Sequence, residues 1–170
     1  MDHRSIDAIR PTGAAEHLPP ATQALLMVEA DGPAHDLPRQ IDALQRALAG
    51  PGLLDMQSGF DPDTIARLWA ARKSLSLAVK RIAPLKLNED MVVPVSRLAD
   101  FVDFIDQTAH AQRLPVVSFG HAGNGNLHVN LMVHPDDADE MARARAALDG
   151  MMQRVLALGG TLSGEHGIGT

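Results

Sequence analysis

The sequence predicts an α+β domain in which helices cover an antiparallel sheet, with a ferredoxin-like arrangement as the nearest common form. Two observations lead to this prediction. Apolar and polar residues alternate with a period of two over residues 127–133, which is typical of a strand. Elsewhere, short apolar runs are interleaved with longer segments whose apolar residues recur at helical spacing. A chain of 170 residues is most simply one domain, long enough for a sizeable core.

The first half of the chain begins with a polar, proline-containing segment, residues 1–22, which predicts a tether or a remnant of a preceding helix. The domain itself is therefore expected to span residues 23–170. Asp36 is the expected N-cap of the first helix, and Pro62 suits the first turn of the second. In chain order we predict a strand at 25–29, a helix at 37–48, a strand at 53–57 and a long helix from residue 62.

The second half is predicted to contribute three further strands and two helices. Residues 86–95 are expected to be extended and to lead to Ser96, the predicted cap of the next helix. That helix carries Phe101 and other apolar residues on one face. Pro135 is expected to start the last helix. The remaining strands are predicted at residues 115–119 and 127–133.

Composition excludes several classes of function. The net charge is −6 and the basic residues form no stripe, which argues against nucleic-acid binding. The chain has no cysteine, so it cannot itself supply disulfides, thiolate metal sites or iron–sulfur ligands. Its apolar runs are too short for a transmembrane segment, and no secretory signal is evident. We therefore expect a cytoplasmic protein.

Two glycine-rich loops concentrate the residues suited to metal binding and proton transfer. His121 and His128 bracket the first loop, which joins two predicted strands, so both are expected near the mouth of a hairpin. Asn130 shares a face with His128 because side chains alternate along a strand. Glu165 and His166 lie in the second loop. Two imidazoles and a carboxylate make an open three-ligand set for a divalent metal, and His166 would be a spare imidazole for proton transfer.

The alternative interpretation of these loops is a polar turn with incidental histidines, and for any single histidine it is the better one. The combined pattern in two loops favours a site. A phosphate cradle is a weaker alternative, because neither loop has the Walker lysine or the G-x-G-x-x-G spacing that opens a helix.

Arg72 lies within the apolar stripe of the long predicted helix, and Ser76 lies one turn beyond it. A guanidinium on an apolar face needs a partner, because burying it unpaired is costly. The functional interpretation is a contact with a substrate carboxylate. The structural interpretation is an ion pair with Glu89 or Asp90, or a side chain that extends its charged end to solvent, and periodicity alone favours the structural role. Lys86 precedes a strand and gives no independent signal.

Four motifs follow one another along the chain: Leu68-Trp-Ala-Ala-Arg72, Lys86-Leu-Asn-Glu-Asp90 through Val93-Pro94, His121-x-Gly-x-Gly-Asn-Leu-His128, and Gly159-Gly-Thr-Leu-Ser-Gly-Glu-His-Gly-Ile-Gly169. In type and order they resemble the C-terminal domain of the FAD-linked oxidases, the group of D-lactate dehydrogenases, glycolate oxidase D-type subunits and D-2-hydroxyglutarate dehydrogenases. The resemblance starts near residue 25. The family usually has aspartate where Asn124 stands. It also continues beyond Thr170, so we expect the domain to be truncated at its C-terminus.

This resemblance implies a flavin-dependent oxidoreductase that converts a lactate-like or glycolate-like D-2-hydroxy acid to the 2-oxo acid and passes a hydride to FAD. The implied catalytic residue is His166, which would take the hydroxyl proton. The implied ligands of a divalent metal, expected to be zinc, are His121, His128 and Glu165. The implied substrate-binding residues are Arg72, Ser76, Lys86 and Asn130.

The same resemblance implies partners. FAD would be bound mainly by an N-terminal domain that is absent from this sequence, so the isolated chain is expected to be inactive. Besides that domain and the small 2-hydroxy acid, electron-transfer partners at a membrane and a second copy of the chain are open options. Two alternatives from other classes remain: a stand-alone, non-catalytic module that binds a metal or a small acid, and a metal hydrolase.

Overall fold

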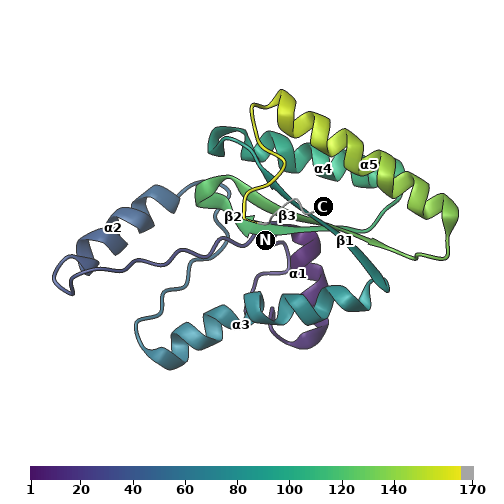
Figure 1. Ribbon diagram of the computed structural model, residues 1–170. Coiled ribbons are helices and arrows are strands. Elements are labelled where there is room, and N and C mark those ends of the chain that lie inside the picture. Colours follow the sequence, from purple (N-terminus) through teal and green to yellow (C-terminus); the bar gives the residue numbers. More distant parts are fainter. Residues whose placement is uncertain (166–170) are drawn as a thin grey trace.

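The computed structural model describes residues 1–165 as five α-helices around one three-stranded antiparallel sheet (Figure 1). The predicted α+β class is therefore confirmed. The strands are β1 (Leu85–Val92), β2 (Val116–His121) and β3 (Asn126–Val133). The helices are α1 (His3–Ile9), α2 (Leu37–Leu48), α3 (Pro62–Ala78), α4 (Leu98–Gln112) and α5 (Ala138–Ala157).

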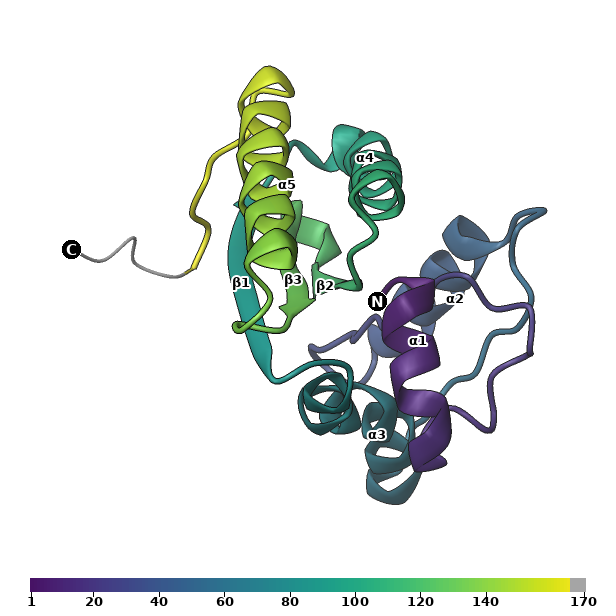
Figure 2. The same cartoon turned by 90° about the vertical axis from the view of Figure 1, so that its right-hand side faces the viewer.

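Strand β3 is the centre of the sheet, because the strand order is β1-β3-β2. Both neighbours run antiparallel to it, so that Leu131 lies opposite Leu87 of β1 and Val116 of β2. Helices α4 and α5 cover one face of the sheet, and α1 and α3 lie on the other side (Figure 2). All residues of β3 are buried as a result.

Two hydrophobic clusters hold these layers together. The larger one lies between the sheet and helices α4 and α5, and it includes Phe101 from the predicted helical face. The smaller one joins α1 and α3 to the sheet through Leu75, Val117 and Met132. The sequence predicts that the face of β3 with His128 opens to a site or to solvent. The smaller cluster covers part of that face, which the alternating pattern could not indicate.

The N-terminal segment packs into the molecule. Residues 3–9 form α1, whose N-cap is Asp2; the carboxylate of Asp2 accepts the backbone N–H of Ser5. Ile6 and Ile9 are fully buried. These residues therefore form a packed helix and not a tether, while the other predicted possibility, a remnant of a preceding helix, stays a prediction. Two isoleucines in one short segment carry too little periodicity to show a packed helix before its partners are known.

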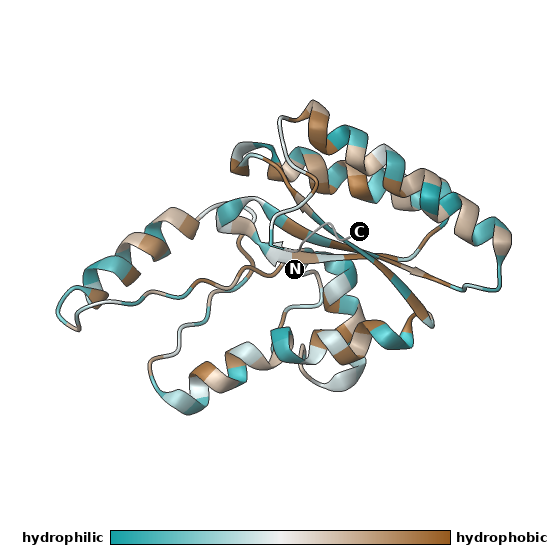
Figure 3. Ribbon diagram, viewed as in Figure 1, coloured by the Kyte–Doolittle hydropathy of each residue, from teal (hydrophilic) through white to brown (hydrophobic). Residues whose placement is uncertain are grey.

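Helix α2 and its flanking segments form an arm that extends from the rest of the molecule (Figure 1, Figure 3). The helix lies where predicted, but none of its residues is buried. The predicted strands at 25–29 and 53–57 are wrong, since both segments are irregular and expose Leu26 and Leu54. An apolar run becomes a strand only where a neighbouring strand supplies hydrogen bonds and cross-strand contacts. Without these strands, a ferredoxin-like topology is not shown.

The helices of the second half begin close to the predicted positions. Ser96 lies inside a 3₁₀ turn, Val95–Arg97, and is not the N-cap of α4. Helix α5 begins after Asp137, whose carboxylate accepts the backbone N–H of Glu140. None of the helices within residues 1–165 is both long enough and apolar enough to cross a membrane.

Candidate metal centre

The β2–β3 hairpin carries the first glycine-rich loop, and backbone contacts explain two of its glycines. Gly125 has φ +71°, and a Cβ atom there would lie 1.9 Å from the carbonyl oxygen of Val93. The same close approach allows the N–H of Val93 to donate to the carbonyl of Gly125 at 3.0 Å. At Gly120, a Cβ atom would lie 2.3 Å from the carbonyl oxygen of Asn126. These glycines therefore let the hairpin close and lie against the end of β1.

The hairpin brings two histidines to one face of the sheet, as the sequence predicts. His121 ends β2, and His128 lies opposite Phe119 on β3. The ring centroids of the two histidines are 5.7 Å apart and their planes are nearly perpendicular. His121 is exposed, whereas His128 is only 8% exposed. One imidazole therefore lies at the rim of the site and the other at its floor.

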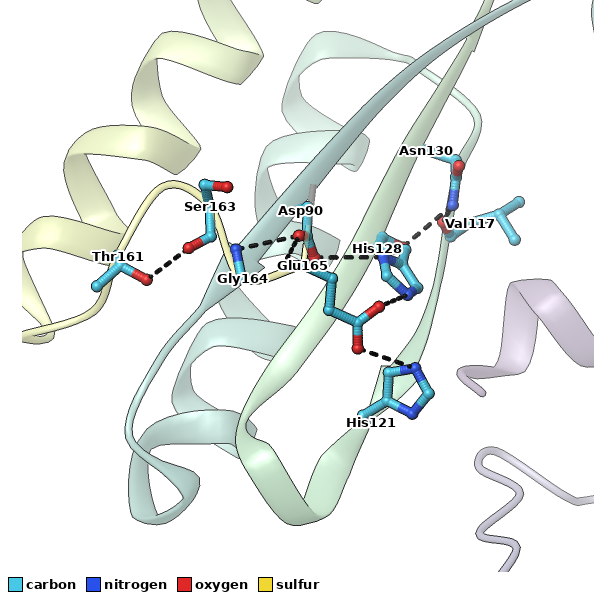
Figure 4. A network of polar contacts seen from close by, with 9 residues as sticks. All are labelled: Asp90, Val117, His121, His128, Asn130, Thr161, Ser163, Gly164 and Glu165. Carbon is cyan, nitrogen blue, oxygen red and sulfur yellow. Dashed lines mark hydrogen bonds and ion pairs between the residues drawn. The ribbon is translucent and has the colours of Figure 1, made fainter. Parts of the chain in front are cut away.

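Glu165 reaches these histidines from the far end of the chain (Figure 4). Its Oε1 lies 3.2 Å from Nε2 of His121, and its Oε2 lies 3.9 Å from Nε2 of His128. His121, His128 and Glu165 each offer one potential ligand atom, and these three atoms all lie within 4.8 Å of one another. Two imidazole nitrogens and one carboxylate oxygen at this spacing match the donor types of an open zinc-type site, so the residues present fit the implied metal.

The segment before Glu165 is held along the end of β1. Thr161 pairs with Val92 through two backbone hydrogen bonds of 2.8 and 3.0 Å. A Cβ atom at Gly160 would lie 2.1 Å from the carbonyl oxygen of Val92, so the close pairing requires glycine there. Gly160 thus serves the close approach of two backbones. This pairing across the sheet edge carries Glu165 to the histidines.

Asp90 is the site residue that our sequence reasoning missed. It lies directly opposite His128 in the β1–β3 register and is 4% exposed. Its Oδ1 is 3.4 Å from Nδ1 of His128, and its Oδ2 accepts the backbone N–H groups of Gly164 and Glu165. Strand alternation from Lys86 could have placed Asp90 on one face of β1, but only the register shows that this face is that of His128.

Arg72 does not contact the histidines directly in these ring contacts; the ring of Phe119 lies between its guanidinium and His128. Its guanidinium carbon is 4.9 Å from the ring centroid of Phe119, and that ring contacts His128 edge-on at 5.6 Å. Cation–π contacts of this kind are favourable. The alternative ion pair with Glu89 or Asp90 is absent among residues 1–165. Glu89 points to the opposite face of the sheet, where it lies beside Val129, and its burial raises its pKa.

The other predicted substrate residues differ in their surroundings. Asn130 is fully buried, and its amide nitrogen donates to the carbonyls of Val117 and His128 at 3.1 Å each. Its Oδ1 has no hydrogen-bond partner in the part of the chain that the structure describes. Ser76 and Lys86 are both exposed; Ser76 lies one turn beyond Arg72 on α3, and Lys86 pairs with Met132 toward the far end of β1. His166 lies outside the described residues.

Comparison with known proteins finds relatives that are named as oxidases or dehydrogenases. The chain is 32% identical over 152 residues to "Glycolate oxidase subunit GlcD" of Bacillus subtilis (strain 168), which covers 89% of this chain and 32% of that protein. It is 29% identical over 151 residues to "Probable D-lactate dehydrogenase, mitochondrial" of Danio rerio, covering 88% and 30%. It is 28% identical over 145 residues to "D-2-hydroxyglutarate dehydrogenase, mitochondrial" of Bos taurus, covering 85% and 26%.

The chain therefore spans roughly a quarter to a third of the length of these relatives. The family described as "FAD linked oxidases, C-terminal domain" matches residues 1–170. The glycine-rich hairpin and the second loop, which bring His121, His128 and Glu165 together, lie within that match. The chain belongs to the family of FAD-linked oxidase C-terminal domains.

Proposed function

We propose that this chain is the substrate- and metal-binding domain of a flavin-dependent enzyme that oxidises a D-2-hydroxy acid to the 2-oxo acid. The observation that carries the proposal is the convergence of His121, His128 and Glu165, with their ligand atoms within 4.8 Å of one another, in a chain of this family. The names of three relatives, a glycolate oxidase subunit, a D-lactate dehydrogenase and a D-2-hydroxyglutarate dehydrogenase, all refer to 2-hydroxy acids.

In this proposal His121, His128 and Glu165 would hold the metal, and a set of three protein ligands would leave room for the substrate. A divalent metal, expected to be zinc, would supply a Lewis acid for the substrate hydroxyl when bound, and FAD held by another part of the enzyme would supply the hydride acceptor. Glu165 bridges the two imidazoles, because each of its oxygens faces a different ring nitrogen. His166, the next residue in the sequence, takes the hydroxyl proton while the substrate carbon gives up its hydride.

Arg72 is the proposed anchor for the substrate carboxylate. Its guanidinium rests on Phe119, and no carboxylate of residues 1–165 pairs with it. A planar guanidinium can bind a carboxylate through two parallel hydrogen bonds. Ser76 and Lys86 would add further polar contacts from α3 and β1. Asn130 is enclosed beneath His128, and its Oδ1, which has no hydrogen-bond partner within residues 1–165, is the proposed acceptor in this set.

Calorimetric titration of the 170-residue chain with zinc chloride tests the metal site. We expect binding of one ion per chain, and loss of that binding in the His121→Ala/His128→Ala double variant. His35→Ala is the matched control, because the His35 side chain is highly exposed, precedes α2 and contacts Asp36 rather than any of the three proposed ligands. Equal titration curves for the parent chain and the double variant would refute the proposed centre.

Titration of the zinc-loaded chain with D-lactate and D-2-hydroxyglutarate tests the substrate part of the proposal. Arg72→Lys should weaken hydroxy-acid binding roughly tenfold, because one paired charge-assisted hydrogen bond is lost. Arg67→Lys is the control, since Arg67 is an exposed arginine of the same helix. If the chain binds zinc but no hydroxy acid, the result would instead support the alternative of a non-catalytic module that binds a metal.

A further inference from the structure

We propose that Asp90 is the positioning residue of the metal centre: one carboxylate orients the ring of His128 and fixes the loop that carries Glu165. This inference rests on the proposed metal site, because it assigns Asp90 a role toward two of its three ligands. Asp90 itself is not proposed to touch the metal or the substrate.

The position of Asp90 between two elements supports this role (Figure 4). Its strand partner in the β1–β3 ladder is His128, so the two side chains lie side by side on one face. Its other oxygen reaches a segment 74 and 75 residues away in sequence, where Gly164 and Glu165 donate their N–H groups. Asp90 therefore joins β1, β3 and the C-terminal loop at one group.

The chemistry of a carboxylate determines which nitrogen of His128 carries the ring proton. An ionised carboxylate only accepts hydrogen bonds, so a neutral imidazole beside it holds its proton on the facing nitrogen, Nδ1. That leaves the lone pair of Nε2 directed toward Glu165, where the metal is expected. The distance of 3.4 Å between Oδ1 of Asp90 and Nδ1 of His128 is longer than that of a typical hydrogen bond. Carboxylate partners of this kind orient metal-bound histidines, and their loss commonly weakens metal binding about 10–100-fold.

The second oxygen of Asp90 acts on the backbone of Glu165. Two adjacent N–H groups donate to Oδ2, which fixes the direction in which the Glu165 side chain leaves the loop. The side chain itself is 46% exposed, so neighbouring side chains do not enclose it. Holding the backbone therefore reduces the freedom that Glu165 would lose on binding a metal.

Asp90→Asn keeps the shape of the side chain but replaces one hydrogen-bond acceptor, a carboxylate oxygen, with an NH₂ donor. The amide oxygen of asparagine can still accept the N–H groups of the loop, but its NH₂ group must then face Nδ1 of His128. Nδ1 becomes an acceptor, and the ring proton moves to Nε2, which is the nitrogen expected to bind the metal. The variant should keep the loop in place and still impair the centre.

The matched control is Glu140→Gln in the first turn of α5, where Glu140 contacts His134, the residue that follows the other end of β3. Glu140 is also buried, accepts the backbone N–H of His134 at 2.9 Å, and lies 3.0 Å from Nδ1 of the same histidine. The control thus makes the same change from carboxylate to amide at a second histidine–carboxylate pair. It should alter stability without altering the metal centre.

The first measurement is a long-range ¹H–¹⁵N correlation spectrum of the histidine rings in the metal-free chain, recorded near pH 8.5, about two units above the ordinary pKa of histidine. His128 should carry its proton on Nδ1 in the parent chain and in Glu140→Gln, and on Nε2 in Asp90→Asn. A proton on Nε2 in the parent chain would overturn the inference, and this result does not require any variant to fold.

The second measurement is zinc affinity by competition with a chromogenic chelator. We expect Asp90→Asn to lose about 10–100-fold and Glu140→Gln to stay within about twofold of the parent chain. If the parent chain binds zinc and Asp90→Asn binds it equally tightly, the positioning role of Asp90 is overturned, whereas the proposed metal site is not. A parent chain that binds no zinc refutes the proposed function instead, and the ring spectrum then still decides the role of Asp90.

Discussion

Replacing Gly125 with alanine should destabilise the chain, because backbone atoms occupy the space that the new methyl group needs. The residue has φ +71°, and its Cβ would lie 1.9 Å from the carbonyl oxygen of Val93. Flexible side chains can move away from such a contact, but a carbonyl can move only with its strand. The shift would also break the 3.0 Å hydrogen bond from Val93 to Gly125, which ties the hairpin to the end of β1.

The expected magnitude follows from these two effects. A left-handed backbone costs a residue with a Cβ atom about 1–2 kcal/mol. Loss of one backbone hydrogen bond costs about 1 kcal/mol. Their sum of about 2–3 kcal/mol, at roughly 2–4 °C per kcal/mol for a domain of this size, predicts a fall in Tm of about 4–12 °C. Zinc affinity should fall as well, since this turn sets the separation of His121 and His128.

Differential scanning calorimetry of two alanine variants tests this reasoning. Gly123 lies in the same loop, but its φ is not left-handed and no atom lies within 4 Å of the position that a new methyl group would take. Gly123→Ala should therefore change stability by less than about 0.5 kcal/mol. Equal melting temperatures for the two variants would show that the loop does not have the close backbone contact described here.

Two further substitutions concern the stability of the fold away from the site. Gly150→Ala in the interior of α5 should raise the free energy of unfolding by about 0.5–1 kcal/mol, because alanine favours the helix and its methyl group meets open space; a lower Tm would contradict this. Burial raises the pKa of Glu89, so the folded chain binds the proton more tightly than the unfolded chain. The contribution of protonated Glu89 to the free energy of unfolding is therefore fully present below the ordinary pKa of glutamate. It is lost as the pH rises through the raised pKa of the folded chain. Glu89→Gln should raise Tm at pH 7 and have less effect near pH 4, and thermal melts that show no pH dependence of this difference would refute the assignment.

Local pattern was sufficient for helices α2 to α5 and for the hairpin, but not for α1. The proline after Asp61 and the spacing of apolar residues predict α3, and the alternation around Leu127 predicts β3, because both signals depend on neighbours within a few residues. The same signals failed at residues 25–29 and 53–57. A strand needs a partner, and the runs themselves contain no information on whether a sheet edge is within reach.

The sequence by itself determined the class of the molecule, the two glycine loops and the identity of the three metal-ligand candidates, because these follow from residue type and short spacing. Only the tertiary structure decided how they meet. The register of β1 against β3 places Asp90 beside His128, and the pairing of Thr161 with Val92 carries Glu165 to the hairpin. It also places Glu89 on the opposite face from Arg72, which rules out an ion pair between them, one of the structural roles that the sequence left open for Arg72. Such contacts join residues far apart in sequence, and their geometry depends on how many weak interactions across the whole sheet are satisfied together.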